Sequence, residues 1–406
     1  MARQPRCGMK SGWDGAGFRV GRVLSWILTA VAVTPLGLGA QTLAERCGEV
    51  PTDAPPQTQG RWLPWTEDSF AGREPIPEYG PILHRLSEFA EPFRRASVLD
   101  PPPGVEVRPH RVIWGEGPPE LGPPLPRSTL LIQVFHPTVP QAGEASASIE
   151  VMLNTLFPLF YGVGQPIAED EAGPIFMAPE KVGDLADAPV FWSGRPRDCL
   201  VVFKAHDRPL WTPVSRGRFL EALAQEVRNQ VTEADSVFRE ARAEAEPGDA
   251  DREMQEAIRQ LRQMDPEAAA ELERQFIVMK REMDRQRPAL EKAADDAASN
   301  LGAGILDQVA KLEAELASMS PAERASPAYV AGLDASRVSL LSSEGAAGSR
   351  PLVEANVDYL DADTPLEKVQ LLVVELTSSA NHAPEETIIA QLRRDVDWNA
   401  FWGWIR

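Results

Sequence analysis

Residues that bind metals and build active sites are scarce in this sequence. Three cysteines and five histidines occur among 406 residues, with no His-Glu-x-x-His or Cys-x-x-Cys spacing. The histidines are single and far apart, which does not fit a zinc site. Convergence of His110, His136 and His206 from neighbouring strands is the alternative, but lone strand histidines are usually structural. We therefore expect no metal and no cofactor.

Motifs of common enzyme classes are also missing. Neither a Gly-x-Ser-x-Gly turn nor a phosphate-binding Gly-x-x-x-x-Gly-Lys loop occurs, so the usual signals of serine hydrolases and nucleotide-binding enzymes are lacking. Acidic residues are so numerous, 60 in all, that carboxylate pairs suited to glycoside chemistry arise by chance and single out no position. The sequence predicts no catalytic residue.

Basic residues are outnumbered throughout the chain. The 41 basic and 60 acidic residues give a net charge of −19. Without residues 1–40, 36 basic residues face 59 acidic ones, a net charge of −23. A chain this acidic repels phosphate backbones and anionic membrane surfaces, so we expect no nucleic-acid partner. The acidity fits a soluble protein surface.

The first 40 residues have the layout of a secretory signal peptide. Five basic residues precede an apolar run, Val23 to Val33, and Pro35 and small residues lead to Ala40. We expect cleavage after Ala40 and a secreted or periplasmic protein. The alternative is a retained membrane anchor, Val23–Ala40, at the short end of a membrane span. No later run is apolar for long enough, so no stable membrane insertion is expected after cleavage.

Cysteine content fits an exported protein. The chain beyond residue 40 holds two cysteines, Cys47 and Cys199. In an oxidising compartment they are candidates for one disulfide that ties the N-terminal extension to the rest of the chain. Two unpaired thiols are the alternative, which the spacing does not exclude.

The residues that follow divide into an extension and a strand-rich segment. Residues 41–100 form a Pro-rich extension with a short helix near 82–93, and residues 101–215 read as a strand-rich body. No helical crossover of adequate length separates the strands, so we predict a mostly antiparallel sheet. The predicted strands are 105–108, 112–114, 129–135, 149–153, 189–192 and 199–203.

Residues 216–319, here called the arm, differ in composition from the segments on either side. The arm holds no Trp, Tyr, His or Cys, and three of the 37 prolines. Its apolar residues step by three and four, which predicts a long helical, coiled-coil-like insertion. Breaks are expected at 247–249 and at Asp265-Pro266, and a third helical run is expected to begin at Pro288. Each run has one apolar stripe, so we expect an antiparallel hairpin or three helices.

Residues 320–406 return to the body. Ser320 and Glu323 form a capping box, 369–376 reads as a strand, and 385–405 reads as a C-terminal helix that docks on its own sheet. The fold class is therefore α+β: a mostly antiparallel sheet body with a long helical insertion and a C-terminal helix.

One constellation of polar and aromatic residues lies where the strands pass to the arm. A ligand or peptide groove is one interpretation of this cluster. The other is ordinary packing, with His206-Asp207 in a turn and Trp211 filling the sheet–helix junction. The candidate binding residues are Trp192, Arg195, His206, Asp207, Arg208 and Trp211.

Three segments resemble recurring stretches of uncharacterised exported bacterial proteins. They are Arg208–Leu223, Ser318–Tyr329 and Arg350–Asp361, and the resemblance covers about 198–406 in patches. Those proteins usually carry Pro-Asp or Pro-Ala between the Asn and the Tyr-Asp, where this chain has Val357. The resemblance implies an exported α+β protein with a helical insertion and no catalytic residues.

The sequence favours an exported interaction or structural protein of the bacterial cell envelope, acting through the arm. A protein partner or a second copy of the chain is expected to bind through 216–319. The alternative is an envelope hydrolase or ligand-binding protein with a site near the strand-to-arm junction. A third interpretation is an export-system adaptor, which requires a retained anchor at Val23–Ala40.

Overall fold

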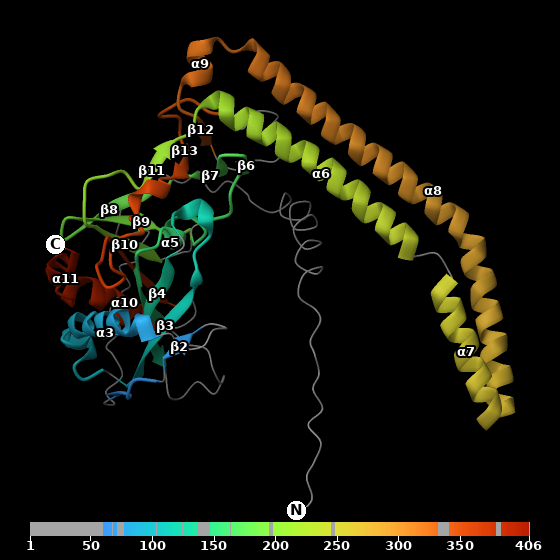
Figure 1. Cartoon of the computed structure of the whole chain (residues 1–406), viewed down its shortest axis with the longest axis horizontal. Helices are drawn as coiled ribbons and strands as arrows, with labels where there is room; N and C mark the ends of the chain where they lie inside the picture. Colours follow the sequence, from blue (N-terminus) through green and yellow to red (C-terminus); the bar gives the residue numbers. More distant parts are fainter. Residues whose placement is uncertain are drawn as a thin grey trace, which may run out of the picture. The chain divides into compact units, whose positions relative to one another are not determined.

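A computed structural model of the chain is shown in Figure 1. The predicted signal peptide, the alternative anchor and Cys47 lie outside the described residues, and so do Arg195 and His136. Two compact units are formed: a body unit (60–219, 325–331 and 341–405) and a helical unit (220–324). The structure describes 60–405 apart from 67, 71–76, 103, 124, 136–146, 163, 195–197, 245–247, 332–340 and 379–382.

A large sheet forms the centre of the body unit. Its strand order is β1-β3-β4-β5-β14-β10-β9-β8, and β2 pairs with β3. Except for β1 and β2, which run parallel to β3, the described neighbours are antiparallel. The strands are β1 (Arg61–Trp62), β2 (Ser69–Phe70), β3 (Glu106–Glu116), β4 (Pro126–Phe135), β5 (Ala147–Leu153), β8 (Lys181–Leu185), β9 (Ala188–Trp192), β10 (Cys199–Lys204) and β14 (Leu371–Ser378). The predicted antiparallel α+β character is confirmed.

Helices cover one face of this sheet. α3 (Gly80–Glu88) contacts β4, α10 (Ala383–Asp395) contacts β14 and β5, and α11 (Asn399–Ile405) contacts β10. With α4 (Glu91–Arg94) they enclose a core of aliphatic and aromatic side chains. Trp62 and Trp65 pack against its edge. The predicted C-terminal helix is two helices, because the chain leaves helical geometry at 396–398, and its apolar residues dock on the sheet as predicted.

A smaller sheet and α5 (Phe157–Phe160) contribute to the core on the other face. The smaller sheet has the order β11-β13-β7-β6, and β12 also pairs with β13. Its pairs are antiparallel. These strands were not predicted from the sequence. They are β6 (Ala168–Asp170), β7 (Gly173–Met177), β11 (Trp211–Pro213), β12 (Tyr329–Ala331) and β13 (Ser349–Ala355).

Three helices account for most of the arm: α6 (Arg216–Glu244), α7 (Gly248–Met264) and α8 (Pro266–Ser318). The Asp265 side chain accepts hydrogen bonds from the backbone N–H groups of Glu267 and Ala268, so α8 begins at the predicted cap. The expected start of a third run at Pro288 is wrong. Pro288 lies inside α8. The helix continues through this position, although proline cannot donate the usual backbone hydrogen bond.

Within the helical unit, α7 packs against α8. Arg262 Nη2 lies 2.5 Å from Glu273 Oε2 across this pair, and Arg228 of α6 forms an ion pair with Glu313 of α8. The capping box is confirmed at α9 (Pro321–Ala325): the Ser320 N–H donates to Glu323 Oε2 at 2.8 Å, and the Glu323 N–H donates to Ser320 Oγ at 3.3 Å.

Candidate functional site

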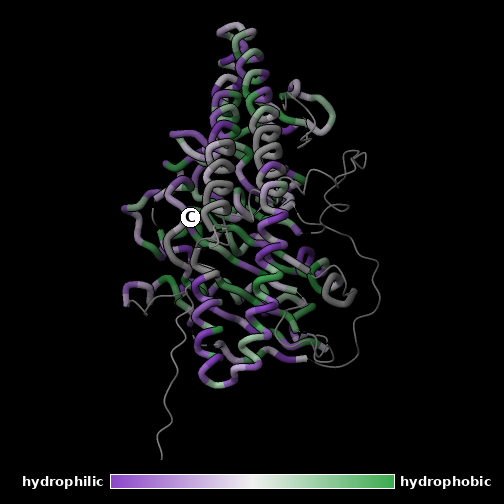
Figure 2. Tube along the Cα trace, turned by 90° about the vertical axis from the view of Figure 1, so that its right-hand side faces the viewer, coloured by the Kyte–Doolittle hydropathy of each residue, from purple (hydrophilic) through white to green (hydrophobic). Residues whose placement is uncertain are grey.

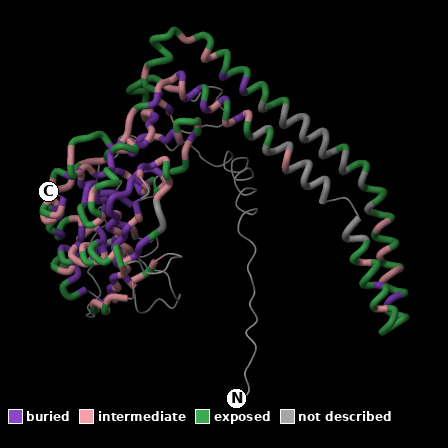
Figure 3. Tube along the Cα trace, in the orientation of Figure 1, coloured by how far each residue is buried: buried purple, intermediate pink, exposed green. Residues whose placement is uncertain are grey.

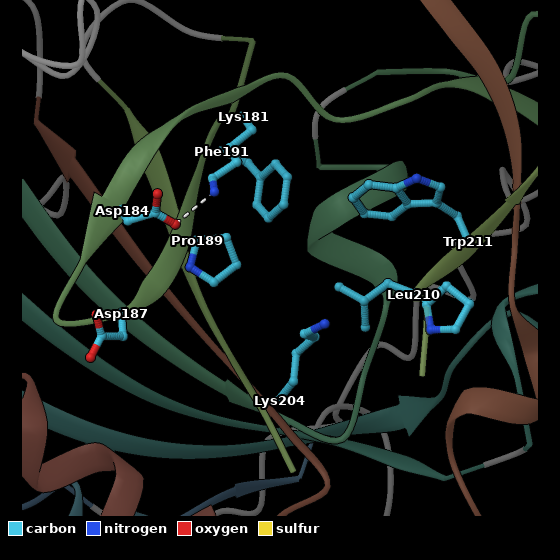
Figure 4. Close-up of a pocket in the computed structure, with 9 residues that line it drawn as sticks. Lys181, Asp184, Asp187, Pro189, Phe191, Lys204, Leu210 and Trp211 are labelled. Carbon is cyan, nitrogen blue, oxygen red and sulfur yellow. Dashed lines mark ion pairs between the residues drawn. The ribbon is translucent and has the colours of Figure 1, made fainter. Parts of the chain in front are cut away.

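A pocket of about 500 Å³ opens on the body unit beside β8–β11 (Figure 4). Its apolar wall includes Phe191, Leu210 and Trp211, and the Phe191 and Trp211 rings meet edge to face with centroids 5.6 Å apart. Among the residues that line it, none is a serine, cysteine or histidine, and its charged groups come from two lysines and two aspartates. The lining residues are Lys181, Asp184, Asp187, Pro189, Phe191, Lys204, Pro209, Leu210 and Trp211.

Lys204 supplies the cationic group of this pocket. Its position at the end of β10 brings the side chain to the pocket floor, and its amino group points toward the space between Phe191 and Leu210 (Figure 4). Lys181 differs, because its ammonium lies 2.7 Å from Asp184 Oδ1 and is neutralised there. An ammonium between aromatic and aliphatic walls suits an anion that also carries an apolar group.

The predicted site residues do not form one constellation. Trp211 lines the pocket, Asp207 is exposed, and Arg208 donates from Nη1 to the Asp358 carbonyl at 3.2 Å. Trp192 lies two positions after Val190, which belongs to the helix-covered core. Because side chains alternate along a strand, Trp192 is on the sheet face opposite Phe191 and the pocket.

His206 lies against the ring of Tyr359, with centroids 4.4 Å apart. Burial lowers the pKa of His206, and the positive charges of Arg208 and Lys204 lower it further. Tyr359 is fully buried and its pKa is raised, chiefly by that burial. His206 thus packs on a buried ring, and it does not line the pocket.

The two described histidines of the convergence hypothesis lie apart in the sheet. His110 is in β3 and His206 follows β10, and β4, β5 and β14 lie between those strands. At about 4.8 Å per strand, this separation is too large for shared metal coordination. Within the part of the chain that the structure describes, no group of three or more His, Cys, Asp or Glu residues is arranged to hold a metal ion.

The segments Arg208–Leu223, Ser318–Tyr329 and Arg350–Asp361 each contribute residues to the smaller sheet. β11 and β12 both pair with β13: Trp211 pairs with Ala355, and Tyr329 pairs with Pro351. Asn356 joins them further, because its Nδ2 donates to the Pro209 carbonyl at 2.8 Å. β11 precedes β12 and β13 by more than a hundred residues in the sequence, yet the three strands form one hydrogen-bonded unit.

Arg218 forms ion pairs with acidic residues on two strands of this sheet. Its Nε lies 2.7 Å from Asp170 Oδ2, and its Nη1 lies 2.6 Å from Glu354 Oε2. The Asp170 carboxylate also accepts backbone hydrogen bonds from Ala172 and Gly173. The hydrogen bond from Arg218 is the main cause of the lowered pKa of Asp170. The first turn of α6 is thereby fixed to β6 and β13 by a charge-assisted pair.

Much of the described part of α7 and α8 is exposed (Figure 3), and the exposed large hydrophobic side chains are concentrated on these helices. Of seven large hydrophobic side chains exposed in the described residues, five lie on α7 and α8. The sequence pattern predicted apolar stripes on these helices but not the additional apolar side chains that are exposed. The signal was the run Phe276-Ile-Val-Met279, because four successive apolar residues cover every side of a helix. The five are Met264, Ile277, Val278, Met279 and Leu306.

Cys199 is 2% exposed and disulfide-bonded, while Cys47, its predicted partner, lies outside the described residues. None of the helices in the described ranges is long and apolar enough to cross a membrane.

Comparison with known proteins gave no match: no protein-family model, curated protein or solved structure resembles the chain. Any assignment of function therefore depends on the chemistry of its own residues.

Proposed function

We propose that this chain is an exported protein of the bacterial cell envelope that binds another protein chain through its arm, a long coiled-coil-like insertion at 216–319. The observation that carries the proposal is the exposed apolar group on α8. Ile277, Val278 and Met279 are 43%, 67% and 48% exposed. These three side chains spread over about 200° of the helix, and exposed apolar side chains favour association, because covering them removes apolar area from water.

The contrast within α8 supports this proposal. On the side facing α7, Ala269 is fully buried and Phe276 is half-buried. The hairpin of α7 and α8 is therefore already covered on its own seam. Val278 lies about 160° around the helix from Phe276 at 100° per residue, so packing within the hairpin does not explain its hydrophobicity. A binding role for this side of α8 accounts for the exposed valine.

Export is the second part of the proposal. It is supported by the basic and apolar layout of 1–40 and by the disulfide at Cys199, since disulfides persist in oxidising compartments. Cys7 lies within the proposed signal peptide, which leaves Cys47 as the partner in the mature chain. Sequencing the N-terminus of the mature protein tests this: Gln41 is expected, and an intact leader in the cytoplasm would refute export.

Thiol labelling in intact envelopes tests the role of the arm. Val278→Cys and Val357→Cys place thiols on the arm and on the body unit, where Val357 is 44% exposed. We expect the thiol at position 278 to react at least ~10-fold more slowly in the envelope than in dilute purified protein, because a partner covers it. The thiol at 357 should react at similar rates in both. Equal rates at 278 in both settings would refute the proposal.

The Lys204 pocket supports a second candidate function, binding of a small ligand by the body unit. The favouring observation is one ammonium pointing between Phe191 and Leu210 (Figure 4). This chemistry selects aromatic or aliphatic carboxylates over neutral ligands. Titration with phenylacetate and indole-3-acetate, followed by Trp fluorescence, is the test. Binding by the native chain and at least ~10-fold weaker binding by Lys204→Met is expected; equal affinity would exclude the role of Lys204.

A further inference from the structure

The exposed face of α8 has a regular charge pattern centred on Val278. At 100° per residue, the side chains four and seven positions away on either side lie within about 40° of Val278 around the helix. They are Glu271, Arg274, Glu282 and Arg285, and each is exposed. Arg274 Nη2 lies 2.6 Å from Glu271 Oε2 on this face. The face thus consists of one apolar centre with charges on both sides.

This pattern is complementary to itself when two helices run antiparallel. In an antiparallel pair centred on Val278, a residue n positions before the centre faces the residue n positions after it in the other copy. Arg274 then faces Glu282, and Glu271 faces Arg285. The two-fold axis repeats each pair, which gives four oppositely charged pairs in one interface.

The apolar residues follow the same symmetry. Val278 meets Val278 of the other copy at the axis, whereas Ile277 and Met279 lie about 100° to either side of Val278 and flank this contact. A parallel pair in register would instead place Arg274 against Arg274 and Glu282 against Glu282, which like-charge repulsion disfavours. Antiparallel pairs shifted by seven residues place Val278 against a charged residue, Glu271 or Arg285. The centred antiparallel register alone combines an apolar middle with opposite charges.

We propose that the partner of α8 is a second copy of this chain, bound antiparallel about a two-fold axis at Val278. The inference depends on the proposed binding role of the arm and names the occupant of that surface. The contact from about 267 to 289 spans ~33 Å of helix. A two-helix contact of this length lies at the small end of specific interfaces, so a reversible dimer with a dissociation constant of roughly micromolar order is expected.

Sedimentation equilibrium of the mature chain, from about 0.5 to 100 μM, tests the proposal across that range. We expect a monomer–dimer equilibrium in the native chain. Val278→Asp should weaken it at least ~10-fold, because it places two carboxylates at the axis. Circular dichroism at matched concentration confirms that the variant keeps its helix content.

Charge reversal tests the register. Arg274→Glu and Glu282→Arg should each weaken dimerisation, and the double variant should restore it, because the opposite charges again face each other. Arg259→Glu is the matched control. Arg259 pairs with Glu256 three residues earlier at 2.7 Å, as Arg274 pairs with Glu271, but it lies on α7 and should leave the equilibrium unchanged.

Each contrary outcome has a distinct meaning. A native chain that stays monomeric up to about 100 μM, or a dimer unaffected by Val278→Asp, overturns the self-association proposed at this surface. A double reversal that fails to restore dimerisation overturns the antiparallel register. A monomer in solution whose residue 278 is still shielded in the envelope refutes self-association but leaves the proposed function intact. A monomer with no shielding refutes both.

Discussion

The body unit and the helical unit use hydrophobic residues in opposite ways. In the body unit, large side chains are enclosed on both faces of the sheet, and Phe89, Phe203 and Phe401 are fully buried. In the helical unit, Val278 and Leu306 are 67% and 59% exposed. Figure 2, coloured by hydropathy, shows hydrophilic and hydrophobic residues mixed along the described turns of the long helices.

This difference separates residues that stabilise the fold from residues that are free to bind. A side chain that is already covered cannot contribute to association, whereas an exposed apolar one contributes when it is covered. We therefore expect the buried side chains of the body unit to determine the stability of the fold. The exposed apolar side chains of the helical unit are available for binding. Substitutions in the two units should have correspondingly different effects.

The largest expected effect is in the core of the body unit. Phe401 contacts the rings of Phe93 and Phe203 at centroid distances of 5.7 and 5.4 Å. Phe401→Ala should lower the free energy of unfolding by about 3–5 kcal/mol, because it leaves a cavity among aromatic rings. Val278→Ala should change it by less than about 0.5 kcal/mol in dilute protein. Urea denaturation measures both, and similar losses would remove the contrast between the units.

Reduction of the disulfide should have the second largest effect on the free energy of unfolding. Treatment with a thiol reductant should lower the free energy of unfolding by about 2–4 kcal/mol, because the unfolded chain gains conformational freedom. Cys199 is part of the core of the body unit, so the loss should appear in the unfolding of that unit. Urea denaturation with and without reductant measures it, and Cys199→Ala, insensitive to reductant, is the control. An unchanged midpoint would contradict the prediction.

Removal of the Arg218 contact should have a smaller effect. Arg218→Met leaves the carboxylates of Asp170 and Glu354 without their cation and should cost roughly 2 kcal/mol at pH 7. The pKa of Asp170 is lowered in the fold, chiefly by its hydrogen bond from Arg218. This stabilisation is present above the usual carboxyl pKa of about 4 and is lost as pH falls through the lowered value.

Unfolding measured from pH 7 to pH 2 checks the sign of this dependence. The difference between native chain and Arg218→Met should shrink as the pH falls below about 4. Arg218→Lys serves as the comparison, because it keeps the charge but not the two-pronged geometry. A difference that stays constant or grows at low pH would contradict the assigned role.

The smallest effect concerns the start of α8. Asp265→Ala removes the side chain that accepts hydrogen bonds from the N–H groups of Glu267 and Ala268 at 3.1 and 3.0 Å. We expect about 1 kcal/mol of local destabilisation. Amide hydrogen exchange should quicken in the first turn of α8 and stay unchanged in β14. Asp265→Asn, which still caps, should behave like the native chain.

Much of the fold follows from local sequence. β4 was predicted because β-branched residues stand between Pro126 and Pro137, and α8 begins at Asp265 because a cap and a proline stand together. Pro288 shows the weakness of such signals. A proline usually interrupts a helix, yet α8 continues through it.

Other features depend on tertiary contacts that no local pattern encodes. β11 pairs with β13 some 140 residues later, and both strands are short and contain proline or charged residues. The pocket likewise requires Lys204 and Trp211 to meet across a turn, so the sequence identified Trp211 and missed Lys204. Trp192 was grouped with Trp211 by proximity in sequence, whereas strand alternation places it on the other face of the sheet.

Photo-crosslinking in living cells tests the binding role of the arm most directly. A photoreactive residue is placed at Ile277 or at Val357, which are 43% and 44% exposed on the helical and body units. The account predicts covalent adducts from position 277 and few from position 357, and, if the partner is a second copy, an adduct of twice the chain mass. Equal yields at the two positions, or none at 277, would contradict it.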